Sequence, residues 1–241
     1  MNSPPPTQGL ERPDTKPRAV VVVPAGGTGQ RMGGTVPKQF LELGGLPLLV
    51  HTLRALAACP SVMEIVPVVP GKDREAVRGM IQTFALEKVA DPVAGGASRQ
   101  ISVANGLVAV TGNPEVIAVH DAARPFPDPA TLDRAIARAA DGVGVVVGCP
   151  AKDTLKQVDD AGRVTGTPDR SRLWQAFTPQ VFPAKMIVSA YEQGTRNGFQ
   201  GTDDASLAEH AGHVVEMIEG GREALKVTTP LDLEIARAWI K

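Results

Sequence analysis

Short apolar runs alternate along this chain with segments whose apolar residues recur every three or four positions. The runs are rich in valine and isoleucine, as in strands that are buried on both faces of a parallel sheet. They predict strands at residues 20–23, 62–69, 88–91, 115–120, 143–149, 214–218 and 224–227. The segments with helical spacing predict helices at residues 47–59, 73–84, 98–110, 129–140, 183–193, 203–210 and 230–240. This order indicates a three-layer, Rossmann-like α/β fold around a mostly parallel sheet.

Residues 151–170 interrupt this alternation. Two short extended stretches, 154–158 and 163–165, flank the turn Asp159-Asp160-Ala161-Gly162, and together they predict a protruding β-hairpin. The segment is polar and has little apolar surface to bury on its own. It is therefore either an arm that docks on another surface or an ordinary surface loop.

Composition narrows the class of protein. The chain has 241 residues, a formal net charge of -1 and 4% aromatic residues, which argues against nucleic acid or an anionic membrane as a partner. No apolar run approaches the roughly 20 residues of a membrane-spanning helix. Cys59 and Cys149 lie far apart in apolar settings without metal-binding spacing, so we expect buried, reduced thiols in a cytoplasmic protein. Residues 1–17 are proline-rich and polar, and they predict a disordered tail before one domain at residues 18–241.

The first predicted strand leads into a glycine-rich loop. Pro24 ends the strand, and Ala25-Gly26-Gly27-Thr28-Gly29 follows it, with Arg31 and Lys38 a few residues later. Glycines let the backbone approach a ligand and turn its N–H groups toward phosphate, and two cations neutralise the phosphate charge. The loop therefore predicts a phosphate or nucleotide site, with an ordinary glycine-rich turn as the alternative.

The spacing of this loop does not fit two common nucleotide-binding motifs. A dinucleotide fingerprint requires a third glycine where Met32 stands, and the acidic ribose partner expected roughly 20 residues after the turn is also missing. A Walker loop requires Lys-Ser/Thr where Thr35-Val36 stands. Hydride transfer and Walker-type ATP hydrolysis are therefore disfavoured.

Polar residues gather after several predicted strands, where ligands bind in open parallel sheets. Asp121 directly follows a buried strand and suits Mg²⁺, which takes one or two carboxylates plus phosphate oxygens; capping a neighbouring turn is the alternative. Arg124 suits phosphate or a structural pair with Asp121, whereas His120 fits a buried strand-end residue better than a base. Arg99 suits phosphate or the ordering of the Gly95-Gly96 loop, and the sequence leaves this choice open.

For several further polar groups, an ordinary structural role is the alternative to a role in ligand binding. Composition favours an exposed edge residue over a phosphate ligand for Lys226, and Glu223 beside it would face solvent unless it assists a metal. Asp169-Arg170 closes the hairpin and would pass as a surface ion pair. Thr202-Asp203-Asp204 matches a helix N-cap whose acidic residues favour the helix dipole, and Asp73 is a predicted N-cap as well.

Taken in order, these segments resemble a known family. Residues 24–32 and 37–40 resemble the signature loop of the sugar-nucleotide and alditol-phosphate nucleotidyltransferases. Seven further motifs narrow the resemblance to the 2-C-methyl-D-erythritol 4-phosphate cytidylyltransferase family, which it matches from about residue 19 to the C-terminus. They are His120-Asp121-Ala122-Ala123-Arg124-Pro125, Asp153-Thr154, Asp169-Arg170, Leu173-Trp174, Thr178-Pro179-Gln180, Thr202-Asp203 and Lys226-Val227-Thr228.

The resemblance implies a nucleotidyltransferase fold and a reaction of CTP with methylerythritol 4-phosphate that gives the CDP-alditol and pyrophosphate. The substrate phosphate would attack the α-phosphorus in line, without a covalent intermediate, with Mg²⁺ or another divalent cation as cofactor. The resemblance also implies that residues 151–170 are an arm that crosses into a second subunit, so that a homodimer shares each site.

By the same resemblance, the family's functional residues correspond to named positions of this chain. The catalytic cations correspond to Arg31, Lys38 and Lys226. For Lys226, the resemblance thus favours a phosphate ligand over the exposed edge residue that composition favours. Asp121 corresponds to the metal ligand, and Glu223 corresponds loosely to a second one. The nucleotide pocket corresponds to Ala25, Gly26, Gly27, Gly29, Gly96, Ala97, Ser102, Ala122 and Arg124. The residues that hold the substrate phosphate and hydroxyls correspond to Thr154, Arg170, Thr202 and Asp203.

Three positions depart from the residues usual in the family. Gly26 stands for an alanine, which is a mild change because the backbone acts there. Ala97 stands where the family often has an acidic side chain near the base, so backbone or water is expected to replace that contact. Glu223 stands for an aspartate, which leaves the second metal contact open.

Two other functions remain as alternatives. Ribitol-5-phosphate cytidylyltransferase shares the loop and the CTP site, and Arg170 together with Thr154 and Thr202 favours methylerythritol phosphate over ribitol phosphate. A non-catalytic nucleotide-binding regulator would keep the glycine loop, but it would not need Lys38, Asp121 and Lys226 together. Their joint presence therefore favours an enzyme.

Overall fold

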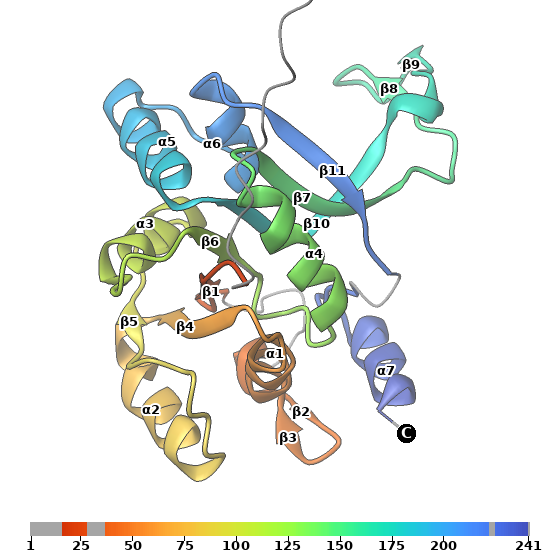
Figure 1. Cartoon of the computed structure of the whole chain (residues 1–241). Helices are drawn as coiled ribbons and strands as arrows, with labels where there is room; N and C mark the ends of the chain where they lie inside the picture. The colour runs from red at the N-terminus through yellow and green to blue at the C-terminus, as the bar shows by residue number, and fades with distance from the viewer. Residues whose placement is uncertain (1–15, 28–36, 222–224, 241) are drawn as a thin grey trace, which may run out of the picture.

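The computed structural model describes residues 16–27, 37–221 and 225–240, with a seven-stranded sheet at its centre (Figure 1). The strands are β1 Ala19–Pro24, β4 Val62–Val69, β5 Val93–Ala94, β6 Val116–Val119, β7 Gly144–Pro150, β10 Trp174–Pro183 and β11 Val215–Glu219. Their order is β11-β7-β10-β6-β1-β4-β5, and β10 runs antiparallel to both of its neighbours. The other neighbouring pairs are parallel, which confirms the mostly parallel sheet.

Helices cover both faces of the sheet, so the predicted three layers are confirmed (Figure 1). One face is covered by α1 Leu48–Ala57, α2 Arg74–Thr83 and α4 Pro129–Ala139. The other face is covered by α3 Arg99–Ala109, α5 Ala184–Asn197 and α6 Asp204–His210. Because side chains alternate along a strand, Val21 and Val23 of β1 join the first core and Val22 joins the second. Beside these layers lie β2 Glu42–Leu43, β3 Leu46–Pro47 and α7 Pro230–Trp239.

A third apolar cluster brings the C-terminal segment back to the sheet. Leu233 and Val227 pack in it against Leu43 of β2. The Val227 N–H donates a hydrogen bond to Ala123 O at 2.8 Å. This contact places Lys226 beside the residues that follow β6.

The close approach of α3 to the sheet depends on a glycine. A Cβ at Gly106 would lie 2.5 Å from Val22 Cγ1 and 2.8 Å from Val68 Cγ2, and both valines are fully buried. We therefore expect Gly106→Ala to overpack this interface and to lower the free energy of unfolding in urea by about 1–3 kcal/mol. Gly79→Ala is the matched control, because a Cβ in this exposed part of α2 would meet no atom within 4 Å. It should stabilise the protein by about 0.5–1 kcal/mol, and a loss at both positions would contradict the packing argument.

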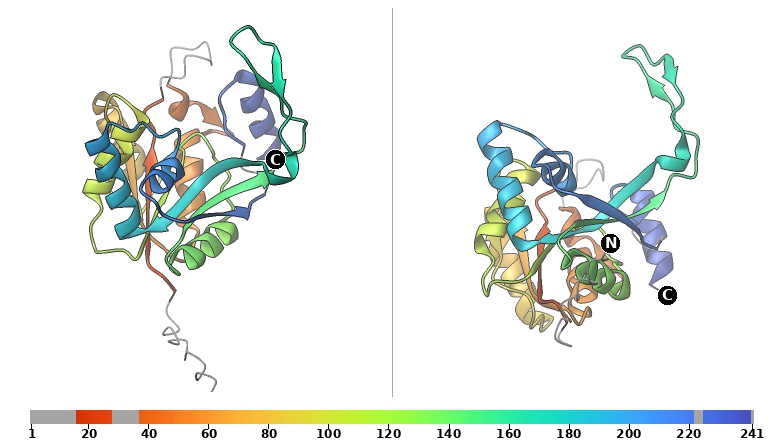
Figure 2. Two further views of the ribbon diagram at one scale, coloured as in Figure 1. Left: turned by 90° about the horizontal axis from the view of Figure 1, so that it is seen from above. Right: turned by 45° about the horizontal axis from the view of Figure 1, so that its top comes forward.

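The predicted hairpin is present and projects from the body of the molecule (Figure 2). Its strands, β8 (Gln157–Val158) and β9 (Val164–Gly166), form a separate two-stranded sheet. Leu155, Val158 and Val164 are 42%, 58% and 61% exposed. The arm therefore carries apolar surface that its own chain leaves uncovered.

Two predicted strands are wrong. Residues 88–91 hold an isolated bridge between Val89 and Ile65, and the edge strand β5 begins only after Pro92, which has no N–H for a ladder. Of the predicted strand at 224–227, the described residues 225–227 form no strand. The apolar side chains of Leu225 and Val227 pack in the third cluster. The Val227 N–H donates to the carbonyl of Ala123, which lies in a loop and not in a strand, so no ladder forms here.

Strand β10 is the largest element that the sequence pattern does not predict. Trp174, Gln175 and Ala176 at its start are exposed, and Pro179 lies within it. Both features argue against a central strand when only the sequence is read. The ladder to β7 is irregular between Ala176 and Gln180, so the proline lies where regular pairing is interrupted.

Smaller differences concern a helix cap, the thiols and the tail. Asp73 precedes α2, but its side chain makes no capping hydrogen bond. Cys59 is buried as expected, whereas Cys149 is partly exposed, and neither is in a disulfide. Residues 1–15 of the predicted tail lie outside the described residues, and Lys16 forms an ion pair with Asp133 at 2.7 Å. In the part of the chain that is described, no helix is both long and apolar enough to cross a membrane.

Candidate active site

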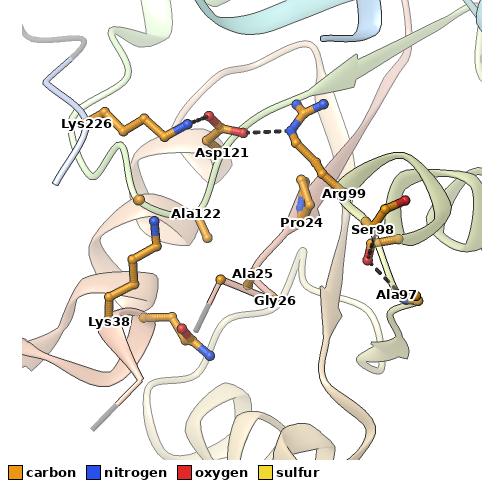
Figure 3. Close-up of a pocket in the computed structure, with 15 residues that line it drawn as sticks. Pro24, Ala25, Gly26, Lys38, Ala97, Ser98, Arg99, Asp121, Ala122 and Lys226 are labelled. Carbon is orange, nitrogen blue, oxygen red and sulfur yellow. Dashed lines mark hydrogen bonds and ion pairs between the residues drawn. The ribbon is translucent and has the colours of Figure 1, made fainter. Parts of the chain in front are cut away.

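A cavity of about 250 Å³ opens at the carboxyl edge of the sheet, where β1 and β6 end (Figure 3). Its walls come from the loop after β1, the loop between β5 and α3, the turn after β6, and Lys226. The lining residues are Pro24, Ala25, Gly26, Gly27, Lys38, Gln39, Gly96, Ala97, Ser98, Arg99, Ser102, Asp121, Ala122, Ala123 and Lys226. The cavity therefore lies at the edge where ligands collect in open parallel sheets.

Many of the predicted nucleotide and phosphate residues meet in this cavity. Those that line it are Ala25, Gly26, Gly27, Lys38, Gly96, Ala97, Ser102, Asp121, Ala122 and Lys226. The predicted residues within the described ranges that do not line it are Arg124, Thr154, Arg170, Thr202 and Asp203. Gly29, Arg31 and Glu223 lie outside the described residues. The predicted nucleotide half of the site is thus largely assembled, whereas the predicted substrate half lies elsewhere.

Asp121 is the carboxylate of the cavity wall, and three cations surround it. Its Oδ2 accepts a hydrogen bond from Lys226 Nζ at 2.7 Å, and its Oδ1 accepts one from Arg99 Nε at 3.2 Å. Arg124 Nε lies 3.8 Å from Oδ2. Burial alone would raise the pKa of Asp121, but the charges of Arg99 and Lys226 outweigh it and hold that pKa well below its usual range. Asp121 is therefore ionised at neutral pH.

Arg99, the first residue of α3, joins the cavity to helix α6. Its Nη1 and Nη2 donate to the two carboxylate oxygens of Asp204 at 3.0 and 2.8 Å. Asp204 is fully buried and also accepts a hydrogen bond from Tyr191 Oη at 2.6 Å. Burial would lower the pKa of Arg99, but Asp204 and Asp121 raise it above its ordinary value. The side chain is therefore a fixed cation, shared between two carboxylates.

The loop before α3 is ordered by two serines. Ser98 caps the helix by accepting a hydrogen bond from Ile101 N at 3.1 Å. Ser102 Oγ accepts from Gly96 N at 3.1 Å and donates to Ser98 O at 2.8 Å. A Cβ at Gly96 would lie 2.1 Å from Ile101 Cγ2, so this loop conformation requires glycine. Ser102 thus shapes the predicted nucleotide pocket through the loop backbone.

The opposite wall of the cavity follows β1. The Ala25 N–H donates to Val68 O at 2.7 Å, so this N–H is used by the sheet, and Gly26 has no atom within 4 Å of an added Cβ. A Cβ at Gly27 would lie 2.9 Å from Lys38 Cε, so this glycine leaves room for the lysine stem. In Figure 3 the lysine rises from this side toward the wall that carries Asp121 and Lys226.

His120 and Arg124 lie behind this wall. His120 is fully buried, its Nε2 lies 3.0 Å from Arg124 O, and burial lowers the pKa of the ring to about 4. Its position in the core fits the buried strand-end interpretation better than that of a base. Arg124 is buried as well, stacks over the Phe177 ring at 5.2 Å and has its pKa lowered by burial. Arg124 approaches the site through Asp121, which is the structural pairing that the sequence left open.

Two of the predicted substrate residues lie at the start of α6. Asp203 caps this helix by accepting a hydrogen bond from Ser206 N at 2.9 Å, which confirms the N-cap. It also accepts one from Gln180 Nε2 at 2.8 Å, so β10 and α6 are joined here. Thr202 is exposed beside it.

The other two predicted substrate residues belong to the arm. Arg170 Nη1 donates to Lys152 O at 2.7 Å, and Thr154 is exposed. Asp169 accepts hydrogen bonds from Ser171 N and Oγ at 3.0 and 2.8 Å. Asp169 and Arg170 thus have separate partners instead of the ion pair considered from the sequence.

Gln39 is a cavity residue that is not among the predicted site residues, although it lies in the segment 37–40 that resembles the signature loop. It is 2% exposed, it follows Lys38 directly, and among the described residues neither amide atom has a hydrogen-bond partner. A buried amide without partners at a cavity is a candidate ligand contact. Its position directly after Lys38 in this segment is the signal in the sequence that points to it.

From the sequence, Asp204 is expected only as part of a helix N-cap. Its partners Arg99 and Tyr191 are remote in the sequence, so no local motif signals the contact. The guanidinium of Arg99 bonds to two carboxylates and not to the Gly95-Gly96 loop, which disfavours the loop-ordering alternative, whereas binding of phosphate by Arg99 stays a prediction.

The charge of the cavity suits a polyphosphate. Lys38, Arg99 and Lys226 contribute three positive charges to the described lining, against the one carboxylate of Asp121. Within the described ranges, no group of three or more His, Cys, Asp or Glu residues is arranged to hold a metal ion. A divalent cation at the ionised Asp121 would take its other ligands from phosphate oxygens and water, which is the arrangement that Mg²⁺ prefers. The residues present therefore fit a metal–polyphosphate complex.

Comparisons with known proteins agree on one family. The model described as IspD: 2-C-methyl-D-erythritol 4-phosphate cytidylyltransferase matches residues 19–241. The protein of that name from Syntrophus aciditrophicus is 43% identical over 227 residues, which cover 94% of this chain and 97% of that protein. The one from Symbiobacterium thermophilum is 47% identical over 221 residues, 92% of each chain. The crystal structure of 4-diphosphocytidyl-2C-methyl-D-erythritol synthase from Anaerococcus prevotii has a TM-score of 0.82 at 27% identity, over 93% of this chain and 96% of that one. The chain therefore belongs to the 2-C-methyl-D-erythritol 4-phosphate cytidylyltransferase family.

Proposed function

We propose that this protein transfers the cytidylyl group of CTP to 2-C-methyl-D-erythritol 4-phosphate in the non-mevalonate synthesis of isoprenoid precursors. The products are 4-diphosphocytidyl-2-C-methyl-D-erythritol and pyrophosphate. The observation that carries the proposal is the cavity in which Lys38, Arg99 and Lys226 face one ionised carboxylate, Asp121, between two glycine-containing loops. Such a cavity suits a nucleoside triphosphate, and membership of the family names the substrates.

The reaction requires little proton transfer, so positioning and charge neutralisation carry the catalysis. A phosphate oxygen of the alditol phosphate attacks the α-phosphorus of CTP in line. The new P–O bond forms as the bond to the β-phosphate breaks, and pyrophosphate leaves with that electron pair. Lys38 and Lys226 stabilise the added negative charge on the pentacoordinate phosphorus, and we assign Arg31 to the same task.

The nucleoside binds between the two loops. Gly26 and Gly96 leave room for the cytosine and the ribose to approach the backbone. Ala97 offers no acidic side chain, so the base is recognised there through backbone groups or water. Ser102 keeps the Gly96 loop in the required conformation, because its hydroxyl joins Gly96 N to Ser98 O.

Asp121 is the proposed ligand of a divalent cation, with Glu223 as a second candidate. When bound with the triphosphate, the cation supplies charge neutralisation and orients the phosphates. Lys226 and Arg99 neutralise Asp121 in the present structure, at 2.7 and 3.2 Å. A cation held by Asp121 would displace Lys226, the more exposed of the two partners, and Lys226 would then be available to the phosphates, whereas Arg99 keeps its paired bonds to Asp204.

The alditol phosphate is proposed to bind in a site shared by two subunits. Thr154 and Arg170 of the arm would reach toward the cavity of a partner, and Thr202 and Asp203, which lie outside the cavity lining, would complete the site. Three observations support a homodimer of this kind: the arm projects from its own body, it exposes apolar side chains, and its polar candidates do not line the cavity of their own chain (Figure 2).

The test of the function measures the release of pyrophosphate from CTP in the presence of Mg²⁺, in parallel assays with methylerythritol 4-phosphate and with ribitol 5-phosphate as the acceptor. The proposal expects a strong preference for the first. A preference for ribitol 5-phosphate would keep the chemistry and change the substrate. Release with neither acceptor would overturn the proposal.

Arg170→Ala tests the shared substrate site. We expect the KM for methylerythritol 4-phosphate to rise about 10- to 100-fold, the effect of losing a hydrogen bond between charged groups, with CTP affinity near that of the wild type. Steady-state kinetics and a calorimetric CTP titration measure the two quantities. Arg163→Ala, an arginine at the turn of the same arm, is the control and should change neither. A collapse of CTP affinity in Arg170→Ala would place this residue in the nucleotide site instead.

A further inference from the structure

Arg99 divides its hydrogen bonds unequally between two carboxylates. Both terminal nitrogens bind Asp204, at 3.0 and 2.8 Å, in a paired geometry. Asp121 receives the single Nε–H bond, at 3.2 Å. Paired guanidinium–carboxylate contacts are both stronger and more directional than single ones, so Asp204 determines where this side chain lies.

Asp204 is itself held firmly. Its side chain is fully buried, and Tyr191 Oη donates to Oδ1 at 2.6 Å. It is the first residue of α6, and Asp203 fixes the start of that helix by capping it. A buried carboxylate in such a setting needs its cation, because an unpaired charge there is costly. Arg99 therefore stays with Asp204 whatever else happens in the cavity.

Asp121 is held more loosely. Its second partner, Lys226, has a side chain that is 41% exposed and lies on a segment outside any helix or strand. Its bond to Arg99 is single and long. Arg124 Nε lies 3.8 Å from Oδ2, beyond hydrogen-bond distance. A metal ion that binds with a triphosphate thus competes for the oxygens of Asp121 with one exposed lysine and with an arginine whose two terminal nitrogens are bound to Asp204.

We propose that Asp204 is a positioning residue: by holding Arg99, it limits that cation to one weak bond to Asp121 and keeps Asp121 available to a divalent metal ion. The inference rests on the proposed metal role of Asp121. It assigns a function in metal binding to a residue outside the cavity lining. The effect passes through Arg99, which lines the cavity and contacts both carboxylates.

The test measures CTP binding by calorimetry over a series of Mg²⁺ concentrations, without the alditol phosphate. In Asp204→Asn, Arg99 loses its buried anion and turns fully to Asp121. We expect the Mg²⁺ concentration that gives half of the gain in CTP affinity to rise about tenfold. In Arg99→Gln/Asp204→Asn the competing cation is absent, so this concentration should be no higher than in the wild type.

The double variant also keeps the proposal testable if Asp204→Asn alone does not fold. It leaves no unpaired buried ion, so it remains measurable even if the single variant is too unstable to purify. Tyr191→Phe is the structural control, because it removes a hydrogen bond from Asp204 but no charge. It should lower the melting temperature and leave the Mg²⁺ requirement unchanged.

Three results would overturn the inference: an unchanged Mg²⁺ requirement in Asp204→Asn, a raised requirement in the double variant, or a shift in Tyr191→Phe as large as that in Asp204→Asn. These results leave the proposed function standing if the wild-type protein releases pyrophosphate. A wild-type protein whose CTP affinity ignores Mg²⁺ would overturn both this inference and the proposed metal role of Asp121.

Discussion

Replacing Lys38 with alanine should lower turnover about 10²- to 10³-fold and leave the protein folded, because one preorganised charge is lost at the transition state. Lys38 begins the short 3₁₀ helix η2 (Lys38–Phe40), and its side chain extends into the cavity (Figure 3). Gly27 provides the room for its stem. Lys38 is only partly buried and its side chain faces the cavity, so the substitution removes charge without opening a core.

The measurement is pyrophosphate release at saturating CTP, Mg²⁺ and methylerythritol 4-phosphate, with urea unfolding as a check on the fold. Lys72→Ala is the matched control: this exposed lysine lies in another short 3₁₀ helix, η3 (Gly71–Asp73), away from the cavity lining. Its turnover should equal that of the wild type. Near-wild-type turnover in a folded Lys38→Ala protein would remove Lys38 from the catalytic step.

The sequence predicts closely those strands and helices whose own pattern of apolar residues shows which positions are buried. The strand expected at residues 62–69 coincides with β4, and the helix expected at 203–210 differs from α6 by one residue. The sequence pattern does not predict β10, because the place of this strand in the sheet depends on the strands that it pairs with. Its exposed start and Pro179 argue against a central strand, yet β6 and β7 provide pairing on both sides.

The residues of the candidate site also divide into those that a local motif reveals and those that only the fold brings together. The glycine loop and Asp121 carry their chemistry in consecutive residues, so motifs reveal them. Lys226 lies 105 residues from Asp121, and composition alone favoured an exposed edge residue. Arg99 and Asp204 are also 105 residues apart, and only the fold shows that they pair. Contacts of this length depend on strand order, which the local pattern does not contain.

The predicted substrate residues Thr154, Arg170, Thr202 and Asp203 do not line the cavity of their own chain. The hairpin was predicted from its turn and its polarity, and it is present. Its role was implied by resemblance, because a polar arm has the same pattern as a surface loop. Thr154 and Arg170 remain predictions that the Arg170→Ala kinetics will decide.

Asp121→Asn should lower turnover about 10²- to 10³-fold in the presence of Mg²⁺, because a neutral amide is a poor replacement for a carboxylate ligand. Asparagine keeps the size of the side chain and one carbonyl oxygen, so Lys226 Nζ, now 2.7 Å from Oδ2, still has an acceptor. The negative charge that Arg99, Lys226 and Arg124 share is lost, and the wall becomes more positive by one unit. CTP without metal should therefore bind several-fold more tightly than to the wild type.

The opposite signs of these two effects separate an electrostatic role from simple unfolding, since an unfolded variant would lose both activity and CTP binding. Turnover with Mg²⁺ and calorimetric CTP titration in a chelator measure them. Asp91→Asn is the control, because Asp91 also pairs with an arginine, Arg78 Nη2 at 2.8 Å, but its side chain is 68% exposed. Exposed pairs contribute about 0–1 kcal/mol, so this variant should match the wild type in both assays. If Asp121→Asn binds metal-free CTP more weakly than the wild type, the carboxylate orders the cavity wall, and its proposed role as the metal ligand loses its basis.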